Sequence, residues 1–167
     1  MKNNKKIVVA NWKMNPSGPD EAKKIFAASR RAARELRRTM AVICPPFVYA
    51  ALFKAAPRER KIALGAQDVF WQLSGSFTGE VGAPMLKNSG AEYVIIGHSE
   101  RRALGESDEV VSKKTAAAVE WGLNAIVCVG EKNRDASGDY FGFIKNQLQA
   151  SLALVKRRFL DRLLVAY

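Results

Sequence analysis

The residue of this chain best suited to acid–base chemistry is His98, its only histidine. An apolar run at residues 93–96 predicts a short buried strand before it, and Gly97 lies between the two. Ser99 and Glu100, which follow, suit the first turn of a helix. Barrel enzymes hold catalytic side chains at this place, between the carboxyl end of a parallel strand and a helix N-terminus. An ordinary surface or core histidine is the structural alternative.

Two further polar side chains follow the first predicted strand, residues 7–10. Asn11 supplies an amide that can orient oxygens, and Lys13 supplies a compact cation for a phosphate or an oxyanion. If the strands are parallel, these residues and His98 leave the same edge and face a common small ligand. A helix N-terminus favours neutral imidazole at His98, which can donate a hydrogen bond to a carbonyl. Together the three groups suit stabilisation of an enediolate, with ordinary polar strand ends as the alternative.

Six short apolar runs predict the strands that position these residues. Most are continuously apolar, as in strands of a parallel sheet that are buried on both faces. They span residues 7–10, 41–44, 62–64, 93–96, 125–129 and 163–167. Helical patterns cover 20–38, 47–55, the turn after His98, 108–121 with Ser107 as N-cap, and 141–159. The alternation predicts one α/β domain over residues 1–167, either an open doubly wound sheet or part of a closed barrel.

One connection, residues 67–83, is unusually long and carries Phe70, Trp71 and Phe77. Long ordered loops in compact domains are often functional, and we expect exposed aromatic side chains here to form a partner surface. Neither a Gly-x-Gly-x-x-Gly dinucleotide motif nor a Gly-Lys-Ser/Thr phosphate loop occurs.

Composition limits the remaining possibilities. Apolar residues make up 48% and charged residues 26%, as in ordinary globular domains. The apolar run after the first lysines is too short for a signal peptide, and the longest apolar run, 47–53, is too short for a membrane span. We therefore expect a cytoplasmic protein without membrane contact. Cys44 and Cys128 are expected to be buried free thiols, and no residues have metal-ligand spacing.

The net charge of +11 arises from 27 basic and 16 acidic residues. The basic residues cluster at Arg30, Arg31, Arg34, Arg37 and Arg38, and at Lys156, Arg157 and Arg158. Apolar residues mark the other face of the first helix, so its arginines are interpreted as a solvated side: Ala22, Ile25, Phe26, Ala33 and Leu36. Because no aromatic residues are interleaved for base stacking, we expect no nucleic-acid partner. A basic nucleic-acid-binding module is the least favoured alternative, and attraction of an anionic substrate is another use of the charge.

Five motifs, in order along nearly the whole chain, resemble the signatures of the triosephosphate isomerase family. They are Ala10-Asn11-Trp12-Lys13-Met14-Asn15, Thr78-Gly79-Glu80 with Met85-Leu86, residues 95–102, Gly105-Glu106-Ser107-Asp108-Glu109, and Cys128-Val129-Gly130-Glu131. The resemblance implies a TIM (β/α)₈ barrel that interconverts dihydroxyacetone phosphate and D-glyceraldehyde 3-phosphate through an enediolate. It also implies a place in glycolysis and gluconeogenesis, and no metal or organic cofactor.

The resemblance assigns roles to five residues at matching positions. His98 resembles the electrophile that polarises the substrate carbonyl, and a neutral histidine in this role is already known for the family. Lys13 resembles the cation at the substrate and its phosphate, with Asn11 as a binding residue beside it. Ser99 is similar to a serine that contacts the catalytic base, and Glu100 to a glutamate that supports the lysine.

The resemblance also gives the long aromatic connection a function. Thr78, with Phe77 beside it, resembles the tip of a loop that reaches the active site of a partner subunit. A homodimer is therefore implied.

The chain departs from the family at the catalytic base. In the family a tyrosine–glutamate pair ends the sixth strand, whereas here Tyr167 is the final residue and the catalytic glutamate is absent. A complete barrel needs about 250 residues, so we expect an incomplete one of about six strands and five helices, with two open edges. Loss of a general base typically removes about 10²–10⁴-fold in rate, so we predict that this chain alone is inactive. A non-catalytic or split-barrel partner protein is the alternative function.

Overall fold

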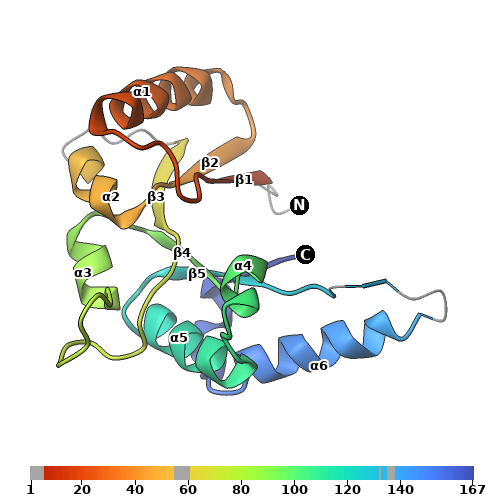
Figure 1. Cartoon of the computed structure of the whole chain (residues 1–167). Coiled ribbons are helices and arrows are strands. Elements are labelled where there is room, and N and C mark those ends of the chain that lie inside the picture. Colours follow the sequence, from red (N-terminus) through yellow and green to blue (C-terminus); the bar gives the residue numbers. More distant parts are fainter. Residues whose placement is uncertain (1–5, 55–60, 132, 135–137) are drawn as a thin grey trace.

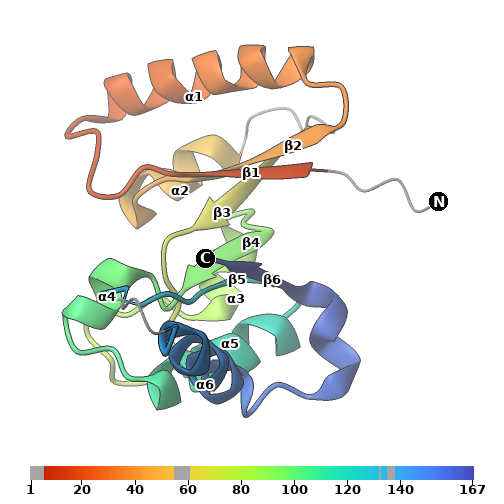
Figure 2. The ribbon, with the colours of Figure 1, turned by 90° about the vertical axis from the view of Figure 1, so that its right-hand side faces the viewer.

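The computed structural model describes residues 6–54, 61–131, 133–134 and 138–167. In this part of the chain six parallel strands form one sheet in chain order: β1 Lys6–Asn11, β2 Thr39–Cys44, β3 Ile62–Ala66, β4 Tyr93–Ile96, β5 Asn124–Cys128 and β6 Leu163–Ala166. The sheet curls into a half-barrel with the helices outside it (Figures 1 and 2). The predicted α/β incomplete barrel is thus confirmed, with β1 and β6 as its edges.

The helices connect successive strands, as right-handed crossovers in a parallel sheet require. They are α1 Pro19–Glu35, α2 Phe47–Lys54, α3 Ala83–Asn88, α4 Ser99–Ala103, α5 Asp108–Glu120 and α6 Tyr140–Leu152. The Ser107 N-cap is confirmed, because its hydroxyl accepts the N–H of Val110 at 3.3 Å. The predicted end of the second helix, residue 55, lies outside the described residues.

The sequence pattern misplaced the ends of two helices. α1 ends at Glu35 instead of residue 38, because Leu36 has an extended backbone and Lys61 Nζ donates to its carbonyl oxygen. The predicted helix 141–159 is in fact α6, which ends at Leu152, followed by a turn and a 3₁₀ helix at Arg157–Arg162. The N–H of Leu154 leaves the helical pattern to donate to Ser112 Oγ at 3.0 Å. The apolar residues that predicted a helix as far as residue 159 keep their spacing beyond Leu152, although the helix itself ends there.

Two other expectations need correction. The described residues contain six α-helices, and the one absent from the sequence analysis is α3, which begins after Gly82 with Pro84 in its first turn. On the predicted apolar face of α1, Ala22, Phe26 and Ala33 are buried but Ile25 is 37% exposed.

The long connection between β3 and α3 is less exposed than expected. Phe70 is buried, and its ring lies 4.1 Å from that of Trp71 and 4.7 Å from that of Phe77. The N–H of Phe70 donates to the carbonyl of Val81 at 2.8 Å, which closes the base of the loop. Phe77 is 43% exposed near the tip, so the loop presents one aromatic edge to solvent instead of three rings.

Apolar side chains pack on both faces of the sheet. Val42, Cys44, Ile95 and Ile126 fill the inner, concave side, and the outer side packs against the helices. Both cysteines are free thiols, as predicted, although Cys128 is only partly buried. Burial, with a smaller effect of Cys128, raises the pKa of Cys44 to about 12. No helix among the described residues is long and apolar enough to cross a membrane.

Candidate functional site

The loop after β1 holds Lys13 in an unusual backbone conformation. Its φ of 56° lies in the left-handed region, which costs a residue with a side chain about 1–3 kcal/mol. Two contacts hold it there: the N–H of Lys13 donates to Asn11 Oδ1 at 2.9 Å, and its carbonyl accepts from Gln67 Nε2 at 2.9 Å. Gln67 also donates to the carbonyl of Cys44 at 2.9 Å and so joins the ends of β1 and β2. Gln67 was not among the residues predicted from the sequence, although it directly follows β3.

His98 caps the N-terminus of α4. Its Nδ1 accepts the backbone N–H of Glu100 at 3.3 Å. A nitrogen that accepts carries no hydrogen, so the ring hydrogen belongs on Nε2 and can be donated to a ligand. The carboxylate oxygen Oε2 of Glu100 lies 3.5 Å from the same Nδ1, but it could pair with Nδ1 only if that nitrogen carried a proton. We assign the amide contact because it satisfies an otherwise unpaired N–H of the helix end.

Glu100 brings Lys13 and His98 together. Lys13 Nζ donates to Glu100 Oε1 at 2.7 Å, across 87 positions of sequence. This hydrogen bond lowers the pKa of Glu100 despite some desolvation. Both side chains are more than half exposed, so solvent weakens the attraction and the contact mainly orients the ammonium group. The predicted neighbours from β1 and β4 therefore meet in the fold.

A cavity of about 1080 Å³ begins on the concave side of the sheet and reaches this rim. Asn11, His98 and Ser99 line it at the carboxyl ends of the strands, and Val9 and Ile126 line its apolar interior. Lys13 and Glu100 lie outside its lining. Thr78 and Phe77 are also outside it, in the loop between β3 and α3.

Arg102 links the ends of β4 and β5 close to His98. It was not among the residues predicted from the sequence. Its guanidinium donates to the carbonyls of Gly97 at 2.8 Å and Cys128 at 3.3 Å, the ends of β4 and β5. It also pairs with Asp108 at 2.5 Å and donates to Ser151 Oγ at 3.1 Å. The side chain is 14% exposed, so these hydrogen bonds are largely shielded from water.

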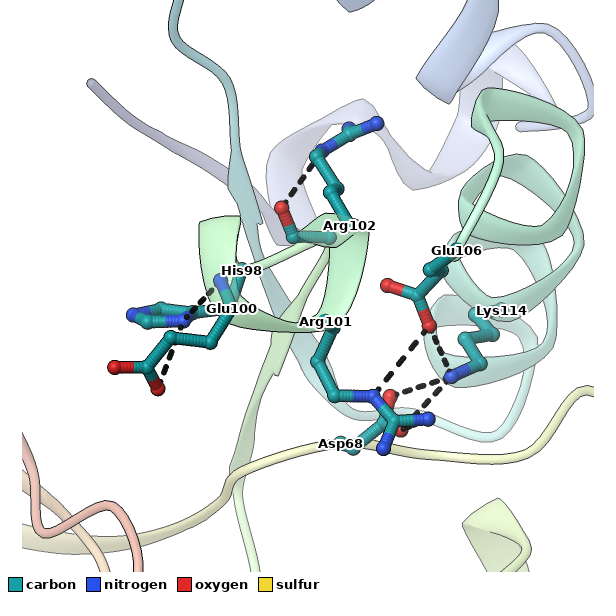
Figure 3. A network of polar contacts seen from close by, with 8 residues as sticks. Asp68, His98, Glu100, Arg101, Arg102, Glu106 and Lys114 are labelled. Carbon is teal, nitrogen blue, oxygen red and sulfur yellow. Dashed lines mark hydrogen bonds and ion pairs between the residues drawn. The ribbon is translucent and has the colours of Figure 1, made fainter. Parts of the chain in front are cut away.

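A buried ionic cluster lies on the other side of α4 from His98 (Figure 3). Lys114 Nζ contacts both oxygens of Asp68 at 2.8 Å and one oxygen of Glu106. Arg101 adds a second cation, 3.0 Å from Asp68. Two acids and two bases cancel, so the cluster anchors the loop after β3 to α4 and α5 without adding net charge at the site.

Among the described residues, Glu131 is one of four carboxylate residues that line the cavity, with Glu106, Asp108 and Asp139. Its Oε1 accepts from Arg134 Nε at 2.9 Å and from the Tyr167 hydroxyl at 3.0 Å. Hydrogen bonding from the backbone, from Arg134 and from Tyr167 lowers its pKa. A carboxylate held in this way is a poor proton acceptor. The described residues contain no group of three or more potential ligands suited to a metal ion.

Comparison with known proteins gives the family. A family model described as triosephosphate isomerase matches residues 6–167, nearly the whole chain. The chain belongs to the triosephosphate isomerase family. Proteins named triosephosphate isomerase from Natranaerobius thermophilus, Bordetella pertussis and Solibacter usitatus are 41%, 42% and 41% identical to it, over 96%, 99% and 98% of its residues. The chain spans 63% of the length of the first and 66% of the length of the other two.

The contact between His98 and the N–H of Glu100 predicts which ring nitrogen carries the hydrogen in this family member. We expect nitrogen NMR of the single histidine at alkaline pH to report the Nε2–H form. Glu100→Gln keeps the backbone N–H, so the same form should persist in that variant. A dominant Nδ1–H form that disappears in Glu100→Gln would contradict the assignment, because the proton would then have served the carboxylate.

The contacts of Arg102 predict a cost for the conservative replacement Arg102→Lys. An ammonium group cannot reach four acceptors on two strands and two helices at once, so we expect a loss of about 1–3 kcal/mol in unfolding free energy. The His98 ring signals should also shift. The control is Arg157→Lys at an exposed position, which should change neither urea unfolding nor the His98 spectrum. Unchanged stability and unchanged His98 signals in Arg102→Lys would refute the positioning function.

Proposed function

We propose that this chain carries the carbonyl-polarising part of a triosephosphate isomerase site, which interconverts dihydroxyacetone phosphate and D-glyceraldehyde 3-phosphate. The observation that supports it most directly is the connected set formed by Lys13, Glu100 and His98 at the carboxyl ends of β1 and β4. A cation and a neutral donor beside a cavity are what a phosphorylated carbonyl substrate needs.

In this proposal His98 donates its Nε2 hydrogen to the substrate carbonyl and stabilises the enediolate oxygen. Lys13 supplies positive charge for the same oxygen and for the phosphate, and Glu100 holds the ammonium group in place. Asn11 and Ser99 line the cavity beside them, where they would bind substrate and contact the catalytic base. All these functions are performed by side chains, without a metal or organic cofactor, in a cytoplasmic enzyme. Cell fractionation that recovers the protein outside the cytoplasm would contradict that location.

Proton transfer at carbon needs a base as well. The carboxylates around the cavity already serve other partners: Glu100 binds Lys13, Glu131 binds Arg134 and Tyr167, Asp108 binds Arg102, and Glu106 binds Lys114. We assign none of them as the base that accepts a proton from carbon. We therefore propose that residues 1–167 alone are inactive, and that the base comes from sequence corresponding to the part of the relatives that this chain does not span. A non-catalytic protein or half of a split barrel is the alternative.

The proposal predicts activity on complementation. The chain is mixed with a polypeptide from the unmatched final third of the Bordetella pertussis relative, and isomerisation is followed in a coupled assay. We expect no activity from either piece alone and measurable activity from the mixture. His98→Gln should lower that activity by about 10²–10⁴-fold, whereas the exposed control Lys145→Gln should not change it.

Activity of residues 1–167 alone at the level of the mixture would overturn the need for an external base. No activity from a mixture of two folded pieces would favour the non-catalytic alternative. Recovered activity that is insensitive to His98→Gln would refute the function proposed for His98.

We also propose a homodimer formed through the loop between β3 and α3. Its tip projects from the sheet in Figure 1, and it presents Thr78 together with the exposed edge of Phe77. Sedimentation of the chain should show a dimer that Thr78→Arg converts to a monomer, because an added charge would have to be buried in the interface. Exposed Glu80→Gln is the control and should remain dimeric. A monomer at every concentration, or a Thr78→Arg dimer as tight as the parent, would contradict this.

A further inference from the structure

The charge of the chain is concentrated in its first part. Residues 1–61 hold 15 lysines and arginines against 4 acidic residues, whereas residues 62–167 hold 12 of each. The entire net charge of +11 therefore belongs to residues 1–61, the part of the sequence that contains β1, α1, β2 and α2. Such asymmetry along a sequence is typical of proteins that contact polyanions.

The fold gathers part of this charge at one end of the sheet. Lys6 begins β1, Arg37 and Arg38 precede β2, and Lys61 precedes β3. Backbone contacts bring these segments together, because the N–H of Lys6 donates to the carbonyl of Arg38 at 3.0 Å. Lys61 Nζ reaches the carbonyl of Arg34 at 3.4 Å, at the end of α1. We call these five cations, Lys6, Arg34, Arg37, Arg38 and Lys61, the basic end.

The basic end faces away from the catalytic rim. The strands are parallel, so the amino ends of β1–β3 lie opposite the carboxyl ends that carry Asn11 and His98. Attraction of the small anionic substrate to the site does not require charge there. A solvated helix face explains the arginines of α1. It does not explain why Lys6, Arg37, Arg38 and Lys61, from three other segments, lie at the same end of the sheet.

Among the described residues, few carboxylates lie near Lys6, Arg37, Arg38 and Lys61 in the sequence. In the described residues 6–11, 34–44 and 61–66 the only carboxylate is Glu35. None of the ion pairs between described residues involves Lys6, Arg37, Arg38 or Lys61. Lys6, Arg37 and Arg38 are exposed. The surface stops at β4, which Glu92 precedes.

We propose that the basic end is a docking surface for duplex nucleic acid, bound through its phosphate backbone. Lysine and arginine on flexible side chains neutralise phosphates without reading sequence. Within the described residues 6–8, 34–46 and 61 the one exposed large apolar residue is Val8, so no aromatic ring is available to stack on unpaired bases and only one side chain could insert into a lipid layer. The proposal replaces the sequence-based expectation of no nucleic-acid partner and is independent of the isomerase proposal.

The test is fluorescence anisotropy of the whole chain with a labelled DNA duplex of about 20 base pairs, at salt concentrations from about 50 to about 200 mM. Neutralisation of about four phosphates gives a slope of roughly −3.6 in log K against log salt, or about a 100-fold loss of affinity over that range. Arg37→Gln with Arg38→Gln should flatten the slope by about 2.

The matched control is Lys145→Gln with Arg157→Gln, which removes the same charge from exposed positions in the neutral part of the chain. It should leave the slope unchanged. Equal weakening by both double variants would overturn the proposal in favour of non-local attraction by net charge. Absent or salt-insensitive duplex binding would also overturn it. Binding to vesicles that contain phosphatidylserine, but not to the duplex, would assign the surface to membranes instead.

Discussion

The position of His98 in the candidate site depends on the ends of β4 and β5, and Arg102 contacts both. A parallel sheet leaves the carbonyls at its carboxyl edge without partners in the next element, and the loops that follow are where position is most easily lost. One guanidinium spans the carbonyls of Gly97 and Cys128 and is itself held by Asp108 and Ser151. His98 directly follows Gly97, so Arg102, which also lines the cavity, helps to place the His98 ring. Figure 3 shows Arg102 close to His98, with its side chain directed to the opposite side of the turn from Glu100.

Lys13, the second residue of the candidate site, has a strained backbone that hydrogen bonds from neighbouring residues stabilise. Lys13 keeps a left-handed backbone because Asn11 and Gln67 satisfy its N–H and its carbonyl. The Lys13 ammonium group donates a hydrogen bond to the Glu100 carboxylate, and the backbone N–H of Glu100 donates to His98 Nδ1. Glu100 thus couples two loops from distant parts of the sequence. A substitution in either loop is expected to shift the side-chain position in the other.

The sequence predicted what depends on short-range pattern. Continuous apolar runs located all six strands, and polar residues directly after two of them located Asn11, Lys13 and His98. It could not locate partners chosen by tertiary approach: Gln67, Arg102 and the Asp68–Lys114 pair look like ordinary surface residues until the strands are side by side. It also misjudged the end of α6, because a single hydroxyl on α5 ends the helix while the apolar spacing continues. Phe70 was expected outside and is buried, since loop composition does not reveal how a loop folds on itself.

The central claim is that Lys13 and His98 act together on one carbonyl ligand within this chain. The most direct measurement is an NMR titration of the chain with dihydroxyacetone phosphate, with the single histidine ring and the Lys13 side chain followed together. The account predicts that both sets of signals move along one saturation curve, whereas inorganic phosphate, which has no carbonyl, moves those of Lys13 alone. A His98 ring that does not respond to the triose phosphate, or responds equally to phosphate, would contradict it.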